Sequence, residues 1–203
     1  MPFVAKRRST GERIDITKVS DPRRELDRKD LQCQFCEADM VLKAGQILRP
    51  HFAHKKKCNS EYRSHPESID HLSAKAEIAY LLKHKWGDEV DVEFEYALPE
   101  RKRIADVMVI WKTGWMQAHE IQLAGISMQE LEERTNDYRA EGIDVIWWLG
   151  KRAATEHNRE WCRNSIGEYG SLEFHRNTKS VRLERPEGRE SGLQASTRAV
   201  ELS

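Results

Sequence analysis

The chain has 203 residues, of which 33% are charged and 38% apolar, so it is long enough for one ordinary domain with a small appendage. Lysine plus arginine and aspartate plus glutamate number 34 each, and this zero net charge does not exclude nucleic acid as a partner, because local clustering matters more than the total. No run approaches about 18 consecutive apolar residues, and the basic N-terminus lacks an apolar core after it. These features argue against a membrane span and a secretory signal and predict a cytoplasmic protein.

The N-terminal region combines basic runs with a metal-ligand pattern. The first 30 residues hold nine basic and six acidic side chains, and a second basic run contains Lys55 and Lys56. Short strands are predicted at 2–6 and 14–19.

Cys33-x-x-Cys36 is followed by His51, His54 and Cys58, which together offer three thiolates and two imidazoles. Zinc prefers four such ligands in a tetrahedron, and a C-x-x-C knuckle supplies two sulfurs at a suitable spacing. We therefore predict a structural zinc held by Cys33, Cys36, His54 and Cys58. His51 remains an alternative ligand, and a redox pair or free thiols remain alternative interpretations.

A helix is predicted between Pro66 and Gly87, because apolar residues recur at helical spacing: Ile69, Leu72, Ala76, Ala79 and Leu82. In chain order the further elements are a strand at 90–98, two strands within 103–124 joined by a tight turn at 112–115, a helix from the N-cap Ser127 to about 141, a buried strand at 143–149, a weaker helix at 154–164 and edge strands at 172–175 and 181–184.

This order predicts an α/β domain whose mixed β-sheet is flanked by helices, preceded by a small zinc ribbon. The predicted boundaries are 1–62 for the basic segment and zinc module, 63–185 for the α/β domain and 186–203 for a flexible tail.

Two carboxylates lie within the apolar strands, Asp106 in the first and Glu120 in the second, with Gln122 on the same face as Glu120. A buried carboxylate without a partner costs several kcal/mol, and a divalent cation shared by two carboxylates compensates that cost. We therefore interpret Asp106 and Glu120 as a candidate metal site for phosphodiester chemistry. In the alternatives, Asp106 pairs with an arginine (Arg103 or Arg134), or Glu120 lies on an exposed face.

The shared site constrains the turn between the two strands. Directly opposed residues in an antiparallel hairpin share a face, and their numbers have a constant sum along the ladder. A two-residue turn at 113–114 would place Asp106 and Glu120 on opposite faces. We therefore predict a three- or five-residue loop, or a bulge beside Gly114.

Polar residues on the two helices add further candidates. Glu67, His71 and Lys75 recur at i, i+4 and i+8, so they form one stripe that either faces the site, with Lys75 at a phosphate, or is simply solvated. Arg134 and Tyr138 share a helix face, where they either clamp a phosphate and stack on a base or pair with a nearby acid.

These motifs together resemble those of the competence protein CoiA family, in the PD-(D/E)XK nuclease superfamily. The resemblance covers roughly residues 30–150. Its marks are the cysteine and histidine motif at 33–58, E-S-x-x-H-x-x-x-K at 67–75, R-x-x-D-V at 103–107, H-E-I-Q at 119–122, R-T-x-x-Y at 134–138 and V-I-W-W-L at 145–149.

The resemblance implies a restriction-endonuclease-like core, a Mg²⁺ site at Asp106 and Glu120, and DNA, including single-stranded DNA, as partner. The superfamily usually has a lysine two residues after the catalytic glutamate, a place that Gln122 holds here. Glutamine cannot act as a base, but it can orient the attacking water.

We expect catalytic roles for Asp106, Glu120, Gln122, Lys75, His71 and Glu67, and nucleic-acid contacts from Arg134, Tyr138, Arg103, Lys55 and Lys56. Two hypotheses follow. The first is a metal-dependent nuclease acting in DNA uptake, recombination or repair, alongside recombination or repair proteins. The second is a catalytically inactive DNA-binding module that keeps the nuclease fold and recruits partners.

Overall fold

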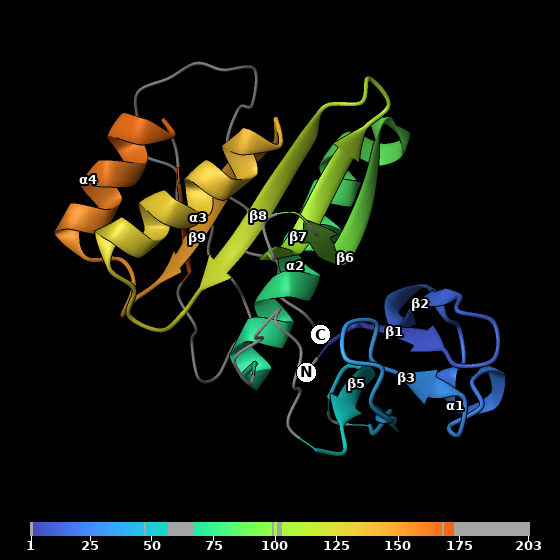
Figure 1. Ribbon diagram of the computed structural model, residues 1–203. Coiled ribbons are helices and arrows are strands. Elements are labelled where there is room, and N and C mark those ends of the chain that lie inside the picture. Colours follow the sequence, from blue (N-terminus) through green and yellow to red (C-terminus); the bar gives the residue numbers. More distant parts are fainter. Residues whose placement is uncertain are drawn as a thin grey trace. The chain divides into compact units, whose positions relative to one another are not determined.

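The computed structural model describes residues 2–46, 48–56, 67–98, 100, 103–167 and 169–172 (Figure 1). The chain divides into two compact units. The first comprises Met1–Leu72 and Phe94–Ile104, and the second comprises Ser73–Glu93 and Ala105–Ser203. The predicted strand at 181–184 and the predicted tail lie outside the described residues.

The first unit contains two small sheets. One has the order β2-β1-β3, formed by Arg13–Asp15, Val4–Arg7 and Leu31–Gln32. The other is an antiparallel hairpin of β4 (Met40–Lys43) and β5 (His51–His54). The predicted second strand ends earlier than expected, because residues 16–18 form a 3-10 helix capped by Asp15, and the short helix α1 (Pro22–Glu25) follows.

A buried glutamate joins the N-terminal strand to a later part of the chain within the same unit. The Glu95 carboxylate accepts hydrogen bonds from the backbone N–H groups of Phe3 and Val4, at 2.9 and 2.8 Å. Phe3 also packs against Phe94, with ring centroids 4.8 Å apart. Glu95 adopts a φ of +48°, so this arrangement holds a non-glycine residue in the left-handed region.

The predicted mixed sheet has five strands in the order β10-β9-β8-β7-β6, and most of it belongs to the second unit. The strands are β6 (Val90–Leu98), β7 (Arg103–Trp111), β8 (Met116–Gln122), β9 (Asp144–Gly150) and β10 (Gly170–Leu172). β7 and β8 are antiparallel, whereas β8, β9 and β10 run parallel. The fold class is therefore confirmed.

Three helices accompany this sheet: α2 (Ile69–Trp86), α3 (Met128–Ala140) and α4 (Glu156–Ser165). Figure 1 shows α3 and α4 side by side next to β8 and β9. The Ser127 hydroxyl accepts from the Glu130 N–H at 3.2 Å, so the predicted N-cap is confirmed. One apolar position of the predicted stripe is not buried: Ile69, in the first turn of α2, is 49% exposed.

The loop between β7 and β8 has three residues, which is one of the arrangements predicted from the carboxylates. Trp111 donates its N–H to the Trp115 carbonyl, which leaves residues 112–114 as the loop, and Gly114 has a φ of +86°. The ladder pairs Val107 with His119, so the pair sum is even. This loop places Asp106 and Glu120 on one face of the hairpin.

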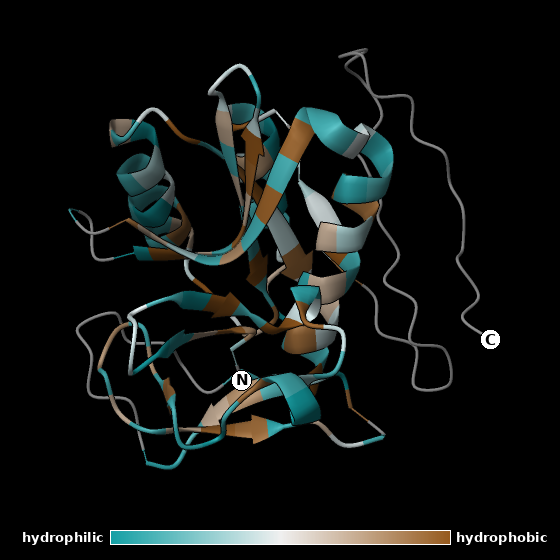
Figure 2. Cartoon of the chain, turned by 90° about the vertical axis from the view of Figure 1, so that its right-hand side faces the viewer, coloured by the Kyte–Doolittle hydropathy of each residue, from teal (hydrophilic) through white to brown (hydrophobic). Residues whose placement is uncertain are grey.

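Hydropathy follows the layers of the fold. Figure 2 shows hydrophobic residues along the strands and hydrophilic residues repeating along the helices. Among the helices of the described chain, none is long and apolar enough to cross a membrane.

Candidate functional site

The two carboxylates lie where β7 and β8 stop pairing. The described ladder ends at Val107 opposite His119, although β8 continues to Gln122. Asp106 and Glu120 are the next residues along the two strands, so they lie opposite each other. The Asp106 Oδ2 accepts a hydrogen bond from the Ile121 backbone N–H at 2.9 Å, so this side chain reaches across to β8 beyond the ladder.

Glu120 is 1% exposed, yet both of its carboxylate oxygens accept hydrogen bonds. Arg134 donates from Nη2 to Oε2, and the Tyr138 hydroxyl donates to Oε1. Both donors come from α3, where a spacing of four residues puts them on one face. These charge-assisted bonds offset the cost of burying a carboxylate.

The Arg134 guanidinium is held from three sides. Its Nη1 lies 3.4 Å from the Gln122 Oε1, and its central carbon lies 4.8 Å from the centre of the Trp147 ring. Burial by itself lowers the pKa of Arg134, but the negative charge of Glu120, with Asp106 contributing, outweighs burial and raises it. Arg134 therefore carries a fixed positive charge in the field of both carboxylates.

Tyr138 is 1% exposed. Burial, followed by the charge of Glu120 and its hydrogen bond, raises the pKa of the phenol well above its ordinary value. The hydroxyl therefore remains a donor to Glu120.

These contacts decide between the alternatives that the sequence left open. Pairing of Arg134 and Tyr138 with a nearby acid is confirmed. The expectation that Tyr138 stacks on a base is wrong for this conformation, because its ring is buried. The alternative of an exposed Glu120 is also wrong. A phosphate contact from Arg134, whose side chain is 21% exposed, stays a prediction.

Gln122 lies on the Glu120 side of β8, since the two residues are two positions apart. Its amide nitrogen donates to the Ala124 carbonyl at 3.0 Å, and its oxygen faces Arg134. Water orientation by Gln122 stays a prediction.

The predicted polar stripe is not a solvated face, and Glu67 lies just before α2, which begins at Ile69. Lys75 is 0% exposed, which excludes contact with a phosphate at the surface in this conformation and corrects that expectation. His71 Nδ1 and Glu67 Oε1 lie 3.6 Å apart within the first unit, and their side chains are 15% and 14% exposed. Catalytic roles for these three residues stay predictions.

No role was predicted from the sequence for Trp147, whose ring contacts Arg134, or for Thr135, which holds that ring. The Trp147 indole donates to the Thr135 hydroxyl at 3.0 Å, and Thr135 is fully buried. Trp147 pairs with Glu120 in the β8·β9 register, which puts both on one sheet face. Both supporting residues stand inside quoted motifs, so the signal was present without an assigned role.

His119 was also left without a role. It is 3% exposed, and its Nδ1 accepts from the Trp148 indole at 2.9 Å. Burial lowers its pKa to about 3, so it is neutral. It adjoins Glu120 in β8 and therefore points to the opposite sheet face.

Asp106 and Glu120 suit a hard divalent cation. Carboxylate oxygens are the ligands that Mg²⁺ prefers. A cationic group, Arg134, already lies on Glu120, which shows that this place attracts positive charge. The donor set therefore fits the predicted metal.

The first unit brings together Cys33, Cys36 and His54, whose ligand atoms all lie within 4.8 Å of one another. Cys36 Sγ and His54 Nε2 are 3.4 Å apart. His51 instead places Nδ1 2.9 Å from the Arg49 carbonyl, so the choice of His54 agrees with the geometry. Cys58 lies outside the described residues.

The chemistry of this cluster also fits a metal. Burial raises the pKa of Cys33 to about 12, and burial lowers the pKa of His54, so without a cation the cluster holds a thiol and a neutral imidazole. Zinc binds the thiolate and neutral imidazole forms, and a bound cation would compensate the buried thiolate.

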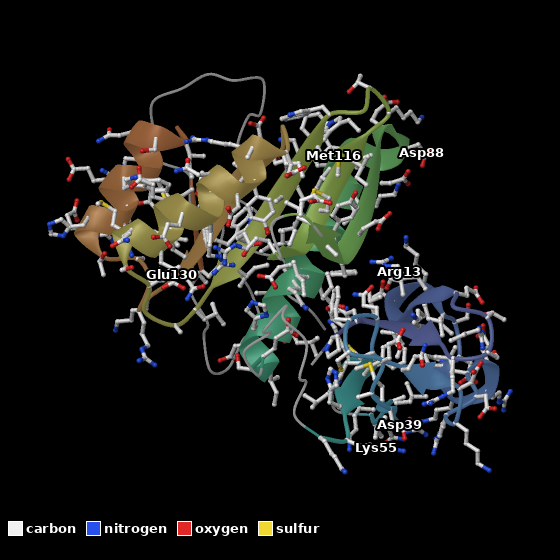
Figure 3. All side chains as sticks on the ribbon, in the orientation of Figure 1. Arg13, Asp39, Lys55, Asp88, Met116 and Glu130 are labelled. Atoms are coloured by element: carbon white, nitrogen blue, oxygen red, sulfur yellow. The ribbon has the colours of Figure 1, made fainter. Side chains whose placement is uncertain are left out.

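The remaining basic candidates have mixed surroundings. Lys55 pairs with Asp39 at 3.2 Å, and Figure 3 shows these two labelled side chains next to each other. Lys56 is exposed, and Arg103 lies partly buried in β7. Their nucleic-acid contacts stay predictions.

Comparisons with known proteins agree with this geometry. A family model described as the nuclease-like domain of competence protein CoiA matches residues 67–183, and one described as the N-terminal domain matches residues 17–62. The chain is 30% identical over 126 residues to competence protein CoiA of Bacillus subtilis (strain 168), which covers 62% of this chain and 33% of that relative. The match thus spans about a third of the relative's length. No solved structure matches the chain.

Proposed function

We propose that this chain, which belongs to the competence protein CoiA family, is a divalent-metal-dependent nuclease that hydrolyses DNA in uptake, recombination or repair. The observation that carries the proposal is the opposition of Asp106 and Glu120 beyond the end of the β7·β8 ladder. The nuclease-like family domain supports the same reaction class.

Each residue of the site has a physical role in this proposal. Asp106 and Glu120 offer charged oxygen ligands, and Tyr138 holds the Glu120 carboxylate in one orientation. Gln122 orients the attacking water through its amide. The metal, when bound, neutralises charge on the scissile phosphate and acidifies a water. The buried surroundings strengthen these electrostatic effects, because they lower the local dielectric constant.

A second candidate is a non-catalytic DNA-binding module that recruits recombination or repair proteins. Two observations favour it. Gln122 stands where the superfamily usually has lysine, and both oxygens of Glu120 accept bonds from side chains of α3.

Cleavage assays separate the two candidates. Plasmid and single-stranded DNA are incubated with Mg²⁺ or with EDTA. We expect Mg²⁺-dependent cleavage by the wild type, loss of cleavage in Asp106→Asn, and retention in Asp91→Asn, which makes the same chemical change at an exposed position of β6. A wild type that binds DNA but never cleaves it would favour the binding module.

We infer a structural zinc for the cluster of Cys33, Cys36 and His54, with Cys58 as the proposed fourth ligand. Four protein ligands leave no position for water, so this zinc would stabilise the N-terminal unit rather than catalyse.

A further inference from the structure

The Arg134 guanidinium pairs with Glu120, the carboxylate that the proposed metal would need as a ligand. Its guanidinium bonds Glu120, whose side chain is 1% exposed, while Arg134 itself is 21% exposed. The anion is thus enclosed, and the cation that balances it borders solvent.

Apart from Glu120, the described groups in contact with the Arg134 guanidinium are uncharged. Gln122 is an uncharged acceptor at 3.4 Å, and Trp147 contributes a ring face. The carboxylate that bonds Arg134 is Glu120, and the more distant charges of Asp106 and Glu130 act on it as well.

We propose that Arg134 is a resident counter-ion of Glu120 that competes with the divalent cation, and that metal binding frees its guanidinium for the phosphodiester. This inference rests on the proposed function and adds a regulatory step at the same site. Two cations cannot share a buried carboxylate without mutual repulsion. Once the metal neutralises the carboxylates, the backbone phosphate becomes the anion that suits the planar, bidentate guanidinium.

Displacement of Arg134 would couple the binding of the metal to the binding of nucleic acid. The phosphate stabilises the displaced position of Arg134, in which Glu120 is open to the metal. By linkage, each ligand must strengthen the binding of the other by the same factor, commonly about 5- to 150-fold.

The test measures metal affinity rather than activity. Mg²⁺ is titrated calorimetrically into the full chain without nucleic acid, in the wild type, Arg134→Gln, Arg134→Lys and Arg139→Gln. Arg139 is the matched control, because it lies on the same helix and donates to the Ser165 carbonyl. We expect Arg134→Gln to bind Mg²⁺ about tenfold more tightly, in the usual range of coupling, and the Lys variant and the control to stay near wild type.

A wild-type measurement covers the case in which Arg134→Gln fails to fold. In nitrogen-15 NMR spectra of the arginine side chains, Mg²⁺ should shift the Arg134 signal and leave the Arg139 signal in place. An unmoved Arg134 signal at saturating Mg²⁺, or an unchanged or lower affinity in folded Arg134→Gln, would overturn the inference.

The Asp106→Asn variant distinguishes a failure of the proposed metal site from a failure of the counter-ion role of Arg134. If the wild type binds Mg²⁺ and Asp106→Asn does not, the metal site stands, and an insensitive Arg134 refutes only the counter-ion role. If the wild type binds no Mg²⁺, with or without a DNA oligonucleotide, the proposed function and this inference both fall.

Discussion

Glu120→Gln should destabilise the second unit more than Asp106→Asn does. Both substitutions keep the side-chain size and remove one negative charge. The difference lies in what each carboxylate holds. Glu120 bonds the Arg134 guanidinium, whereas the Asp106 Oδ2 accepts the Ile121 backbone N–H, a bond that an asparagine oxygen can also accept.

The magnitude follows from burial. Removing one partner of a buried ion pair costs about 3–5 kcal/mol, because the other charge stays buried without compensation. Arg134 is 21% exposed, so water reaches part of its charge, and we expect about 2–3 kcal/mol for Glu120→Gln. Asp106→Asn should cost less than this, because an asparagine oxygen keeps the hydrogen bond from the Ile121 N–H.

The assay is urea unfolding at pH 7 with EDTA, followed by tryptophan fluorescence. All 6 tryptophans belong to the second unit, so the signal reports that unit. The double variant with Arg134→Gln completes a cycle that isolates the pair energy. Equal stability of Glu120→Gln and Asp106→Asn within about 0.5 kcal/mol, the usual limit of additivity, would refute the pairing of Arg134 with Glu120.

Two further predictions concern other buried groups. Elemental analysis should give about one zinc ion per chain, and this zinc content should fall sharply in Cys33→Ser. A fully folded wild type without zinc would contradict the proposed ligand set. The free energy of unfolding should fall as the pH decreases below about 6.5, because the unfolded chain then protonates His119 while the folded chain does not until about pH 3. Between pH 7 and pH 5 this loss of unfolding free energy amounts to about 2 kcal/mol. The variant His119→Gln keeps an acceptor for the Trp148 indole and should reduce the dependence of stability on pH in this range. An unchanged pH dependence in that variant would contradict a neutral, buried His119.

The sequence alone predicted the features that depend on residues close together in the chain, such as the alternation of side chains along a strand and the odd or even length of a loop. Side chains alternate between the two faces of a strand, so requiring Asp106 and Glu120 on one face predicted a loop of three or five residues or a bulge, and the structure has three. The Ser127 cap and the order of helices and strands depend on short-range preferences, and they appear as expected. The choice of His54 over His51 also followed from spacing along the chain, because His54 lies four residues before Cys58.

The tertiary structure alone decided which partners these residues meet. Nothing in the spacing of Arg134 and Tyr138 shows that both donate to Glu120, because α3 and β8 come together only when the helix packs on the sheet. The burial of Lys75 was also decided by the tertiary structure, because its sequence pattern places it in a polar stripe whereas the folded chain buries it fully. Burial and ion pairing depend on contacts between distant segments, and these contacts determine whether a carboxylate is open to a metal or already balanced by an arginine.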